Sequence, residues 1–241
     1  MKAHAAQWIG RRQSQQDFYV VRSYARGMLA VVCDGMGGHA NGDACARMAA
    51  EAFARAFEQN EGGSVADRFR EALDAANEIV GDFVARTKQF GGCTLLAAFV
   101  AAGVLWWVSV GDSPLFLWRR NRLIRLNADH SMRAVFEEFV QSGIMSHADA
   151  LNKGHELRSA VTGEPIPMID LPPTPYLLLP GDRIILSSDG TDELLQVVPL
   201  PRATRDLLDD RADSLAAKIV QACEAIGNPV ADNTTVITVD V

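Results

Sequence analysis

Several aspartates stand where apolar runs of the sequence begin or end, and their carboxylates could bind a cation. Asp34 follows Met28 to Cys33, a nearly continuous apolar run that is typical of a strand buried on both faces. Because strands paired in sheets bring their ends together, acidic residues at such positions can meet in one cleft. The other aspartates at comparable positions are Asp17, Asp112, Asp189 and Asp232.

The residues after Asp34 could help to hold the same cation. Gly35, Gly37 and Gly38 let the backbone turn sharply and bring its carbonyls close to whatever Asp34 binds. An Asp-Gly dipeptide alone indicates an ordinary turn. It indicates a cation site only if other carboxylates lie beside it. Gathering several carboxylates costs on the order of several kcal/mol unless protons or cations compensate, and a hard divalent cation would do so.

Composition limits the possible function classes. The chain has 241 residues, of which 48% are hydrophobic and 22% are charged, and nothing resembles a flexible linker, so we expect one domain over residues 1–241. The formal net charge of -7 argues against general nucleic-acid binding. The longest apolar stretch, Leu95 to Val108, is too short to span a bilayer, and the amino terminus lacks the apolar core of a signal peptide. We therefore expect a cytoplasmic protein without a membrane attachment.

The four cysteines lie in apolar runs without C-x-x-C spacing, which predicts buried free thiols.

Helices and strands are predicted from the periodicity of apolar residues. Amphipathic helices are indicated from Gly42 to Asn60 and from about Val65 to Lys88, which suggests one layer packed on a sheet. From Thr94 to Leu126, short apolar runs with short links predict antiparallel hairpins. Tyr176 to Leu179 and Arg183 to Ser187 predict a further hairpin that delivers Asp189. A helix over Ser214 to Ile226 and a strand from Asp232 complete the chain.

Residues 131–163 interrupt the strand pattern. Two short helices are predicted there, the first after Ser131 and the second after Ser146. We expect this stretch to be an excursion near the mouth of the cleft, and its role is open between substrate selection and a surface insertion.

Short segments in a fixed order connect these elements to a known family. They are RQSQQD at Arg12 to Asp17, DGMGGHANGD at Asp34 to Asp43, GCT at Gly92 to Thr94, GDS at Gly111 to Ser113, NADHS at Asn127 to Ser131, SDG at Ser188 to Gly190 and DN at Asp232 to Asn233. The chain resembles the metal-dependent serine/threonine protein phosphatases of the PPM (PP2C) family, in their compact bacterial form. DGMGGH with SDG and the terminal DN is the most specific part. The resemblance implies an α+β fold, a four-layer α-β-β-α sandwich with two central, mostly antiparallel sheets flanked by helix pairs.

The resemblance also implies a role for each matching residue. Asp34 would bridge two Mn²⁺ or Mg²⁺ ions, with the Gly35 carbonyl on one ion and Asp189 and Asp232 on the other. Four further residues would complete the site: Asp17 in the outer shell, Arg12 on the substrate phosphate, and Asp112 and Glu193 on a third ion. All-oxygen ligands select Mg²⁺ or Mn²⁺ over zinc, and two ions can share a water that attacks phosphorus directly, so no phosphoenzyme is expected.

Some residues depart from the family pattern. Gln16 replaces the usual glutamate, which removes a negative charge near the ions and should weaken the binding of one of them. Glu193 replaces an aspartate, which puts the third ion in question. Met36 stands where eukaryotic relatives have a general-acid histidine. We interpret His39 as polar support for the turn and His130 as a turn or helix-start residue.

The resemblance implies a phosphatase for phosphoserine and phosphothreonine in proteins, opposing a bacterial serine/threonine kinase and acting as a monomer. A second hypothesis is a phosphoprotein-binding module whose metal binding is impaired by Gln16. A third is a partner-switching phosphatase that acts on an anti-sigma-factor antagonist. Intact Asp34, Asp189 and Asp232 argue against the second hypothesis, and the sequence does not separate the first from the third.

Overall fold

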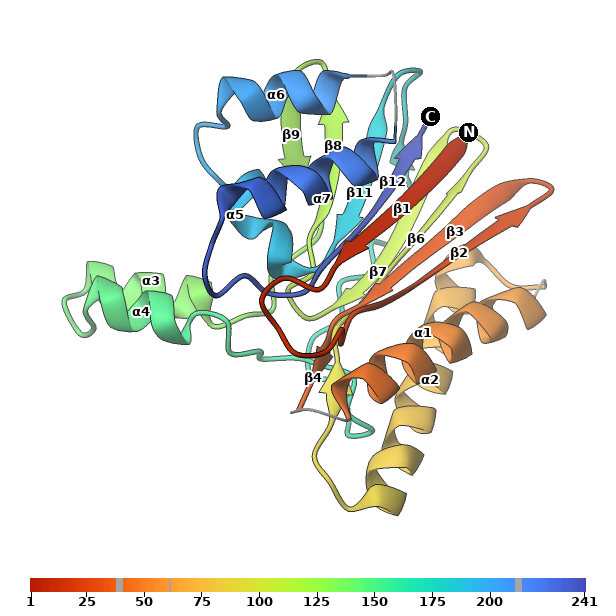
Figure 1. Ribbon diagram of the computed structural model, residues 1–241. Coiled ribbons are helices and arrows are strands. Elements are labelled where there is room, and N and C mark those ends of the chain that lie inside the picture. Colours follow the sequence, from red (N-terminus) through yellow and green to blue (C-terminus); the bar gives the residue numbers. More distant parts are fainter. Residues whose placement is uncertain (38–40, 61, 211–213) are drawn as a thin grey trace.

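Two antiparallel five-stranded sheets carry the fold (Figure 1). The computed structural model describes residues 1–37, 41–60, 62–210 and 214–241. Sheet A contains, in spatial order, β1 (Lys2–Trp8), β12 (Thr234–Asp240), β11 (Arg183–Ser187), β8 (Leu115–Arg119) and β9 (Arg122–Arg125). Sheet B contains β10 (Tyr176–Leu177), β7 (Val104–Val110), β6 (Leu95–Ala101), β3 (Gly27–Cys33) and β2 (Phe18–Tyr24). A small ribbon pairs β4 (Gly35–Met36) with β5 (Gly92–Cys93).

Helices cover the outer face of each sheet, so the molecule has four layers (Figure 1). The pair α1 (Gly42–Gln59) and α2 (Val65–Thr87) packs on sheet B. Sheet A is covered by α5 (Asp192–Leu195), α6 (Arg202–Asp209) and α7 (Leu215–Ile226). The expected sandwich of two antiparallel sheets between helices is confirmed.

Strand β3 shows how the sequence fixes these layers. All seven of its residues are buried, and successive side chains alternate between two apolar clusters. Leu29 and Val31 pack beneath α1 and α2, whereas Ala30 and Val32 face sheet A across the centre of the sandwich. The prediction of a strand buried on both faces is therefore confirmed, and this strand ends directly at Asp34.

The helix ends follow their capping residues. The Ser64 hydroxyl accepts a hydrogen bond from the backbone N–H of Asp67 at 3.1 Å and starts α2. Ser214 caps α7 in the same way, and Gly227, with φ of 74°, ends it. The observed bounds of α1, α2 and α7 agree with the predicted helices to within one residue.

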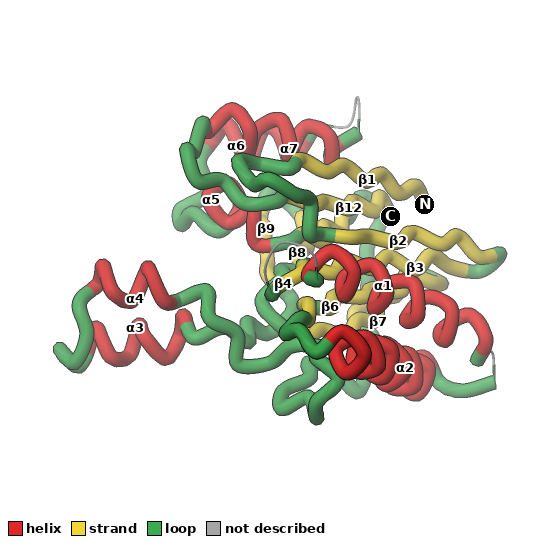
Figure 2. The backbone as a smooth tube through the Cα atoms, turned by 60° about the horizontal axis from the view of Figure 1, so that its bottom comes forward, coloured by secondary structure: helices red, strands yellow, loops and turns green. Residues whose placement is uncertain are grey.

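The two predicted helices of the 131–163 stretch are present and form a pair that projects from the sandwich (Figure 2). They are α3 (Arg133–Gln141) and α4 (His147–Lys153), with Ser146 as the cap of α4. Arg133 ties this pair to the sandwich, because its guanidinium donates to the Asp192 carboxylate at 2.8 Å and to the Gln196 side-chain oxygen at 3.1 Å.

The hairpins predicted from β7 to β8 and from β10 to β11 are wrong, because the chain passes from sheet B to sheet A at each of these turns. β10 pairs with β7 in sheet B, whereas β11 pairs with β12 and β8 in sheet A. The buried Asp182 carboxylate holds the crossing turn, since it accepts hydrogen bonds from the Leu179 N–H at 2.7 Å and from Arg119 at 2.9 and 2.5 Å. The link from β7 to β8 likewise crosses from sheet B to sheet A.

Several elements are missing from the sequence-based prediction, among them β1, α6, the short helix α5 and the β4–β5 ribbon. β1 pairs along its whole length with β12, but its segment KAHAAQW carries no continuous apolar run. α6 begins directly after Pro201 and is only eight residues long, too short for a clear periodic pattern.

The predicted buried thiols are confirmed, because all four cysteines are free and buried. In the part of the chain that the structure describes, none of the helices is long and apolar enough to cross a membrane.

The Arg119–Asp182 pair should stabilise the crossing turn. Burial disfavours the Asp182 carboxylate, but the hydrogen bonds from Arg119 and Leu179 outweigh it and lower its pKa. We expect Asp182→Asn to lower the free energy of unfolding in urea by about 2 kcal/mol, since it leaves a partly buried arginine without its counter-charge. The exposed pair Arg202–Asp206 offers a matched control: Asp206→Asn should change the stability by less than about 0.5 kcal/mol. Equal effects of the two substitutions would contradict this account.

Candidate metal centre

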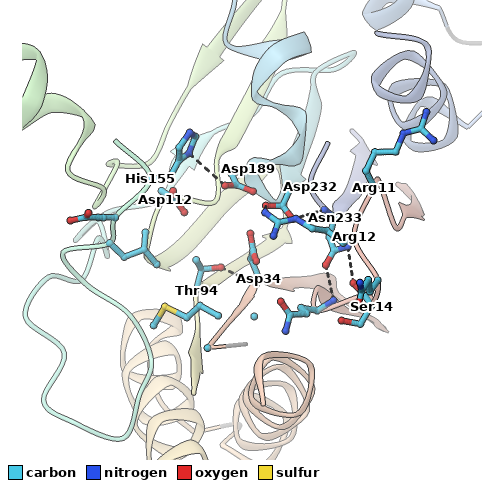
Figure 3. A pocket seen from close by; sticks show the side chains of 17 residues that line it. Arg11, Arg12, Ser14, Asp34, Thr94, Asp112, His155, Asp189, Asp232 and Asn233 are labelled. Carbon is cyan, nitrogen blue, oxygen red and sulfur yellow. Dashed lines mark hydrogen bonds and ion pairs between the residues drawn. The ribbon is translucent and has the colours of Figure 1, made fainter. Parts of the chain in front are cut away.

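Aspartates from both sheets meet in a cleft at one end of the sandwich (Figure 3). The cavity has a volume of about 670 Å³ and is lined by four of the aspartates predicted from the sequence. Sheet B contributes Asp34, after β3. Sheet A contributes Asp189, after β11, and Asp232, before β12. The link from β7 to β8 contributes Asp112.

Thr94 fixes the backbone of Asp34 in this cleft. The Thr94 hydroxyl accepts from the Asp34 N–H at 3.0 Å, and the Thr94 N–H donates to the Asp34 carbonyl at 2.8 Å. The same hydroxyl lies 2.8 Å from the Ser113 hydroxyl. The GCT and GDS segments thereby hold the end of β3 next to the link from β7 to β8.

The crossing from sheet B to sheet A places Asp112. Gly111 has φ of 100°, and a Cβ there would lie 2.6 Å from a Thr94 side-chain carbon, so a glycine is required. The Gly111 N–H donates to Nδ1 of His130 at 3.3 Å. His130 is buried, and burial lowers its pKa, which agrees with its interpretation as a turn residue.

Asp17 lies behind the cleft, where it joins β2 to sheet A. Its Oδ2 accepts hydrogen bonds from the hydroxyls of Ser188 and Thr235, both at 2.7 Å. Ser188 immediately precedes Asp189, so the buried Asp17 positions the backbone that carries a cleft carboxylate.

Asn233 fastens the loop that carries Arg12. Its side-chain nitrogen donates to the carbonyls of Ile9 at 2.8 Å and Ser14 at 3.1 Å, and its side-chain oxygen accepts from the Gln16 N–H at 2.8 Å. The Arg12 guanidinium then forms an ion pair of 2.5 Å with Asp232 at the exposed rim of the cleft. The terminal DN segment therefore brings the amino-terminal arginine to the carboxylates.

Crowding of the carboxylates changes their protonation. Burial, together with the charges of Asp189 and Asp232, raises the pKa of Asp17 to about 7, although the hydrogen bonds that it accepts from Ser188 and Thr235 lower it. Burial, then Asp189, Asp129 and Asp192, raise the pKa of Asp112 to about 8. The Asp189 pKa is raised to about 6, first by burial and then by Asp192 and Asp232. Burial and the charges of Asp17 and Asp189 raise the pKa of Asp34 well above its ordinary value.

These residues fit a hard divalent cation. Among the described residues, Asp17 Oδ1 and Asp189 Oδ1 are enclosed without a hydrogen-bond partner. Burial and neighbouring carboxylates raise the pKa of both groups, so their ionised forms are disfavoured, and a bound cation would offset this cost. The donors are all oxygen atoms, which suits Mg²⁺ or Mn²⁺. No three Asp, Glu, His or Cys side chains in the described ranges enclose an ion by themselves. An open site of this kind suits ions that keep several waters.

The other residues predicted for the site lie at different places. Gly35 lines the cleft, and a Cβ there would lie 2.3 Å from the Gly42 carbonyl oxygen, so this position also requires glycine. Gln16 and Met36 line the cleft as well. Glu193 lies outside this lining; it faces an adjoining groove and accepts a hydrogen bond of 2.6 Å from Asn228. The prediction for His39 lies outside the described residues.

His155 is a cleft residue that the sequence did not single out. It follows α4, and its Nδ1 lies 3.9 Å from Asp189 Oδ2 (Figure 3). With Glu156 and Leu157 it forms the wall that the 131–163 stretch contributes to the cleft. Backbone pairing of Leu157 with Ser131 explains the placement of His155. No local sequence pattern around His155 predicts this placement.

The raised pKa values predict how the stability of the metal-free protein depends on pH. Because the protonated carboxyls are favoured in the folded state, the folded protein binds more protons than the unfolded chain between about pH 4 and pH 8. In EDTA, the free energy of unfolding should therefore fall as the pH rises through this window. Asp112→Asn should raise the melting temperature at pH 8 but not at pH 5, whereas Asp206→Asn should do neither. A lower melting temperature for Asp112→Asn at pH 8 would contradict the carboxylate repulsion.

Comparison with known proteins agrees with this geometry. Residues 6–225 match the family described as Protein phosphatase 2C. The serine/threonine protein phosphatase PstP of Mycobacterium tuberculosis is 28% identical over 228 residues, which cover 90% of this chain but 41% of PstP, so the chain spans less than half of that relative. The serine/threonine phosphatase stp of Listeria welshimeri is 28% identical, with 88% of this chain and 84% of stp covered.

A solved structure gives the same result. The catalytic domain of PstP in complex with two manganese ions superposes with a TM-score of 0.77 at 27% identity and covers 99% of this chain and 97% of that one. The chain belongs to the protein phosphatase 2C family.

Proposed function

We propose that this protein is a metal-dependent phosphatase that hydrolyses phosphoserine and phosphothreonine in proteins. The observation that carries the proposal is the convergence of Asp34, Asp112, Asp189 and Asp232 on one open cleft with Arg12 at its rim. The relatives named serine/threonine phosphatase and the relative solved with two manganese ions support it. In the reaction, water adds to phosphorus, the bond to the serine or threonine oxygen breaks, and inorganic phosphate and the free hydroxyl result.

The cleft aspartates would hold the ions. Asp34, from sheet B, lines the same cleft as Asp189 and Asp232, from sheet A. These carboxylates and the Gly35 carbonyl would hold two Mn²⁺ or Mg²⁺ ions, with Asp34 shared between the two. Asp112 would contribute to a third site. Two bound ions supply a water of lowered pKa and neutralise the charge of the phosphoryl group.

Residues at the edge of the cleft would handle substrate and water. Arg12 is exposed enough to exchange its contact with Asp232 for a substrate phosphate, whose oxygens suit the guanidinium fork. Asp17, with one free oxygen pointing away from its hydroxyl donors, would order water behind the ions. Asn233 keeps the Arg12 loop in place and so acts as a positioning residue.

The biological partners follow from this chemistry. Substrates would be phosphoproteins made by a serine/threonine kinase, and the protein would act as a monomer in the cytoplasm beside that kinase. A phosphorylated side chain of such a substrate would enter the cleft, which has a volume of about 670 Å³.

The first test is hydrolysis of p-nitrophenyl phosphate and a phosphothreonine peptide during a Mn²⁺ titration. We expect turnover that EDTA abolishes and that Asp34→Asn lowers by at least about a hundredfold, because the substitution removes the bridging carboxylate. Rapid acid quench with a ³²P-labelled peptide should leave no label on the protein, since water is the nucleophile. Folded protein that shows no turnover at saturating Mn²⁺ would contradict the proposal and favour the phosphoprotein-binding module.

Gln16 should set the strength of metal binding. Its side-chain nitrogen would lie 2.9 Å from a Cβ at Gly42, the first residue of α1, and it lines the cleft. Gln16→Glu adds a negative charge beside the ions and at a helix amino terminus, which favours it. We expect the dissociation constant for Mn²⁺, measured by calorimetry, to fall roughly three- to tenfold.

The control for this substitution makes the same chemical change on a distant surface. Gln221→Glu, on the exposed side of α7, should leave Mn²⁺ affinity unchanged. Unchanged or weaker binding by Gln16→Glu would show that the amide is not what limits metal affinity.

A further inference from the structure

A second groove adjoins the cleft, and beside the charged residues in its lining it has an apolar wall whose residues are not among the proposed metal ligands. Its volume is about 400 Å³, and its apolar side chains come from the end of β1, the end of α7 and the loop between α7 and β12. Trp8, Ile226 and Val230 form the walls, and the buried Cys223 lies among them. We call this feature the apolar groove.

The apolar groove is continuous with the cleft. Arg12, His155, Asp189 and Asp232 line both cavities. A chain bound with its phosphate at Arg12 therefore has the apolar groove directly beside it. An extended peptide advances about 3.3 to 3.6 Å per residue, so residues within three positions of the phosphorylated one can reach a neighbouring groove of this size.

The walls leave apolar surface in water that a ligand could cover. Val230 is 76% exposed and Ile226 is 46% exposed, although both face a concave surface. Apolar residues that gather in a groove rimmed by polar groups mark ligand-binding surfaces more often than isolated exposed residues do.

Hydrogen bonds hold the groove in shape. Asn228 donates to Glu193 at 2.6 Å, and its side-chain oxygen accepts from the Val230 N–H at 2.9 Å. The Arg11 N–H donates to the Ala231 carbonyl at 2.8 Å, which ties the same loop to the loop that carries Arg12. Because the loop is fixed at both sides, binding there costs little ordering of the protein.

We propose that the apolar groove is a substrate subsite that takes an apolar side chain of the phosphoprotein, within three residues of the phosphorylated serine or threonine. This inference rests on the proposed phosphatase function and deepens it by naming a sequence preference. Glu193 at the rim and the nearby aspartates disfavour an acidic residue in the same place. Partial burial of one leucine side chain in such a groove raises kcat/KM roughly fivefold.

The test compares phosphothreonine peptides at saturating Mn²⁺. The reference peptide has alanine at the three positions on each side of the phosphothreonine; six others carry a single leucine at one of these positions, and a matching six carry aspartate. Wild-type protein should hydrolyse at least one leucine peptide about fivefold faster in kcat/KM than the alanine peptide, and the aspartate peptide for that position should show no gain.

Substitutions in the groove decide whether the groove causes the preference. In Val230→Asp and in Ile226→Ser, the ratio of leucine to alanine kcat/KM should fall to about one. Leu177→Asp changes an equally exposed apolar residue on β10, which does not line the groove, and should keep the wild-type ratio. The ratio compares two peptides with the same variant, so a loss of folded protein lowers both rates and leaves the ratio unchanged. The two substitutions test two independent parts of the groove wall.

The outcomes separate this inference from the proposed function. Equal hydrolysis of all peptides by the wild-type protein would overturn the subsite and leave the phosphatase intact. A leucine preference that survives both groove substitutions would also overturn it. No hydrolysis of any peptide or of p-nitrophenyl phosphate would instead overturn the phosphatase and, with it, the subsite.

Discussion

The burial of several carboxylates beside one another is the constraint on which the rest of this structure depends. The raised pKa values of Asp17, Asp34, Asp112 and Asp189 record how unfavourable their charges are in this position. The cost is offset by the apolar contacts between the two sheets and by the hydrogen bonds that the hydroxyls of Ser188 and Thr235 donate to Asp17. The fold thus keeps a preformed cation site at the expense of its own stability, as functional sites commonly do.

The layers and the cleft aspartates were predictable from the sequence because their signals are local. An apolar run such as Met28 to Cys33 defines a buried strand, and an aspartate at its end can lie only at the edge of a sheet. The partner of each strand is not a local property. The turn at Asp182 looks like a hairpin turn, and the crossing to sheet A depends on Arg119, sixty-three positions earlier. β1 is a strand because β12 offers it an edge, which its own residues do not reveal.

The same distinction explains which site residues could be found. The residues on strand ends, such as Asp34 and Asp232, lie where the pattern places them. Asp192 and Glu193 are adjacent in the sequence, yet one turns to Arg133 of the projecting helix pair and the other to Asn228 of the loop after α7. His155 reaches Asp189 only because the chain returns from α4 to pair beside Ser131. Long-range packing determines where these three side chains lie, and the local sequence pattern does not reveal that packing.

The proposed metal site and the proposed substrate subsite lie on parts of the fold with different constraints. The cleft aspartates sit at the ends of core strands, where a change of one residue would disturb Thr94, Ser188 or Asn233 and hence both sheets. Parts of the walls around the cleft come from the end of α7, the loop that follows it and the 131–163 stretch, where Ile226 and Val230 are exposed. Residues such as Val230 can therefore change without altering the geometry of the carboxylates. A fold arranged in this way can retain one reaction while the sequences that it accepts as substrates diverge.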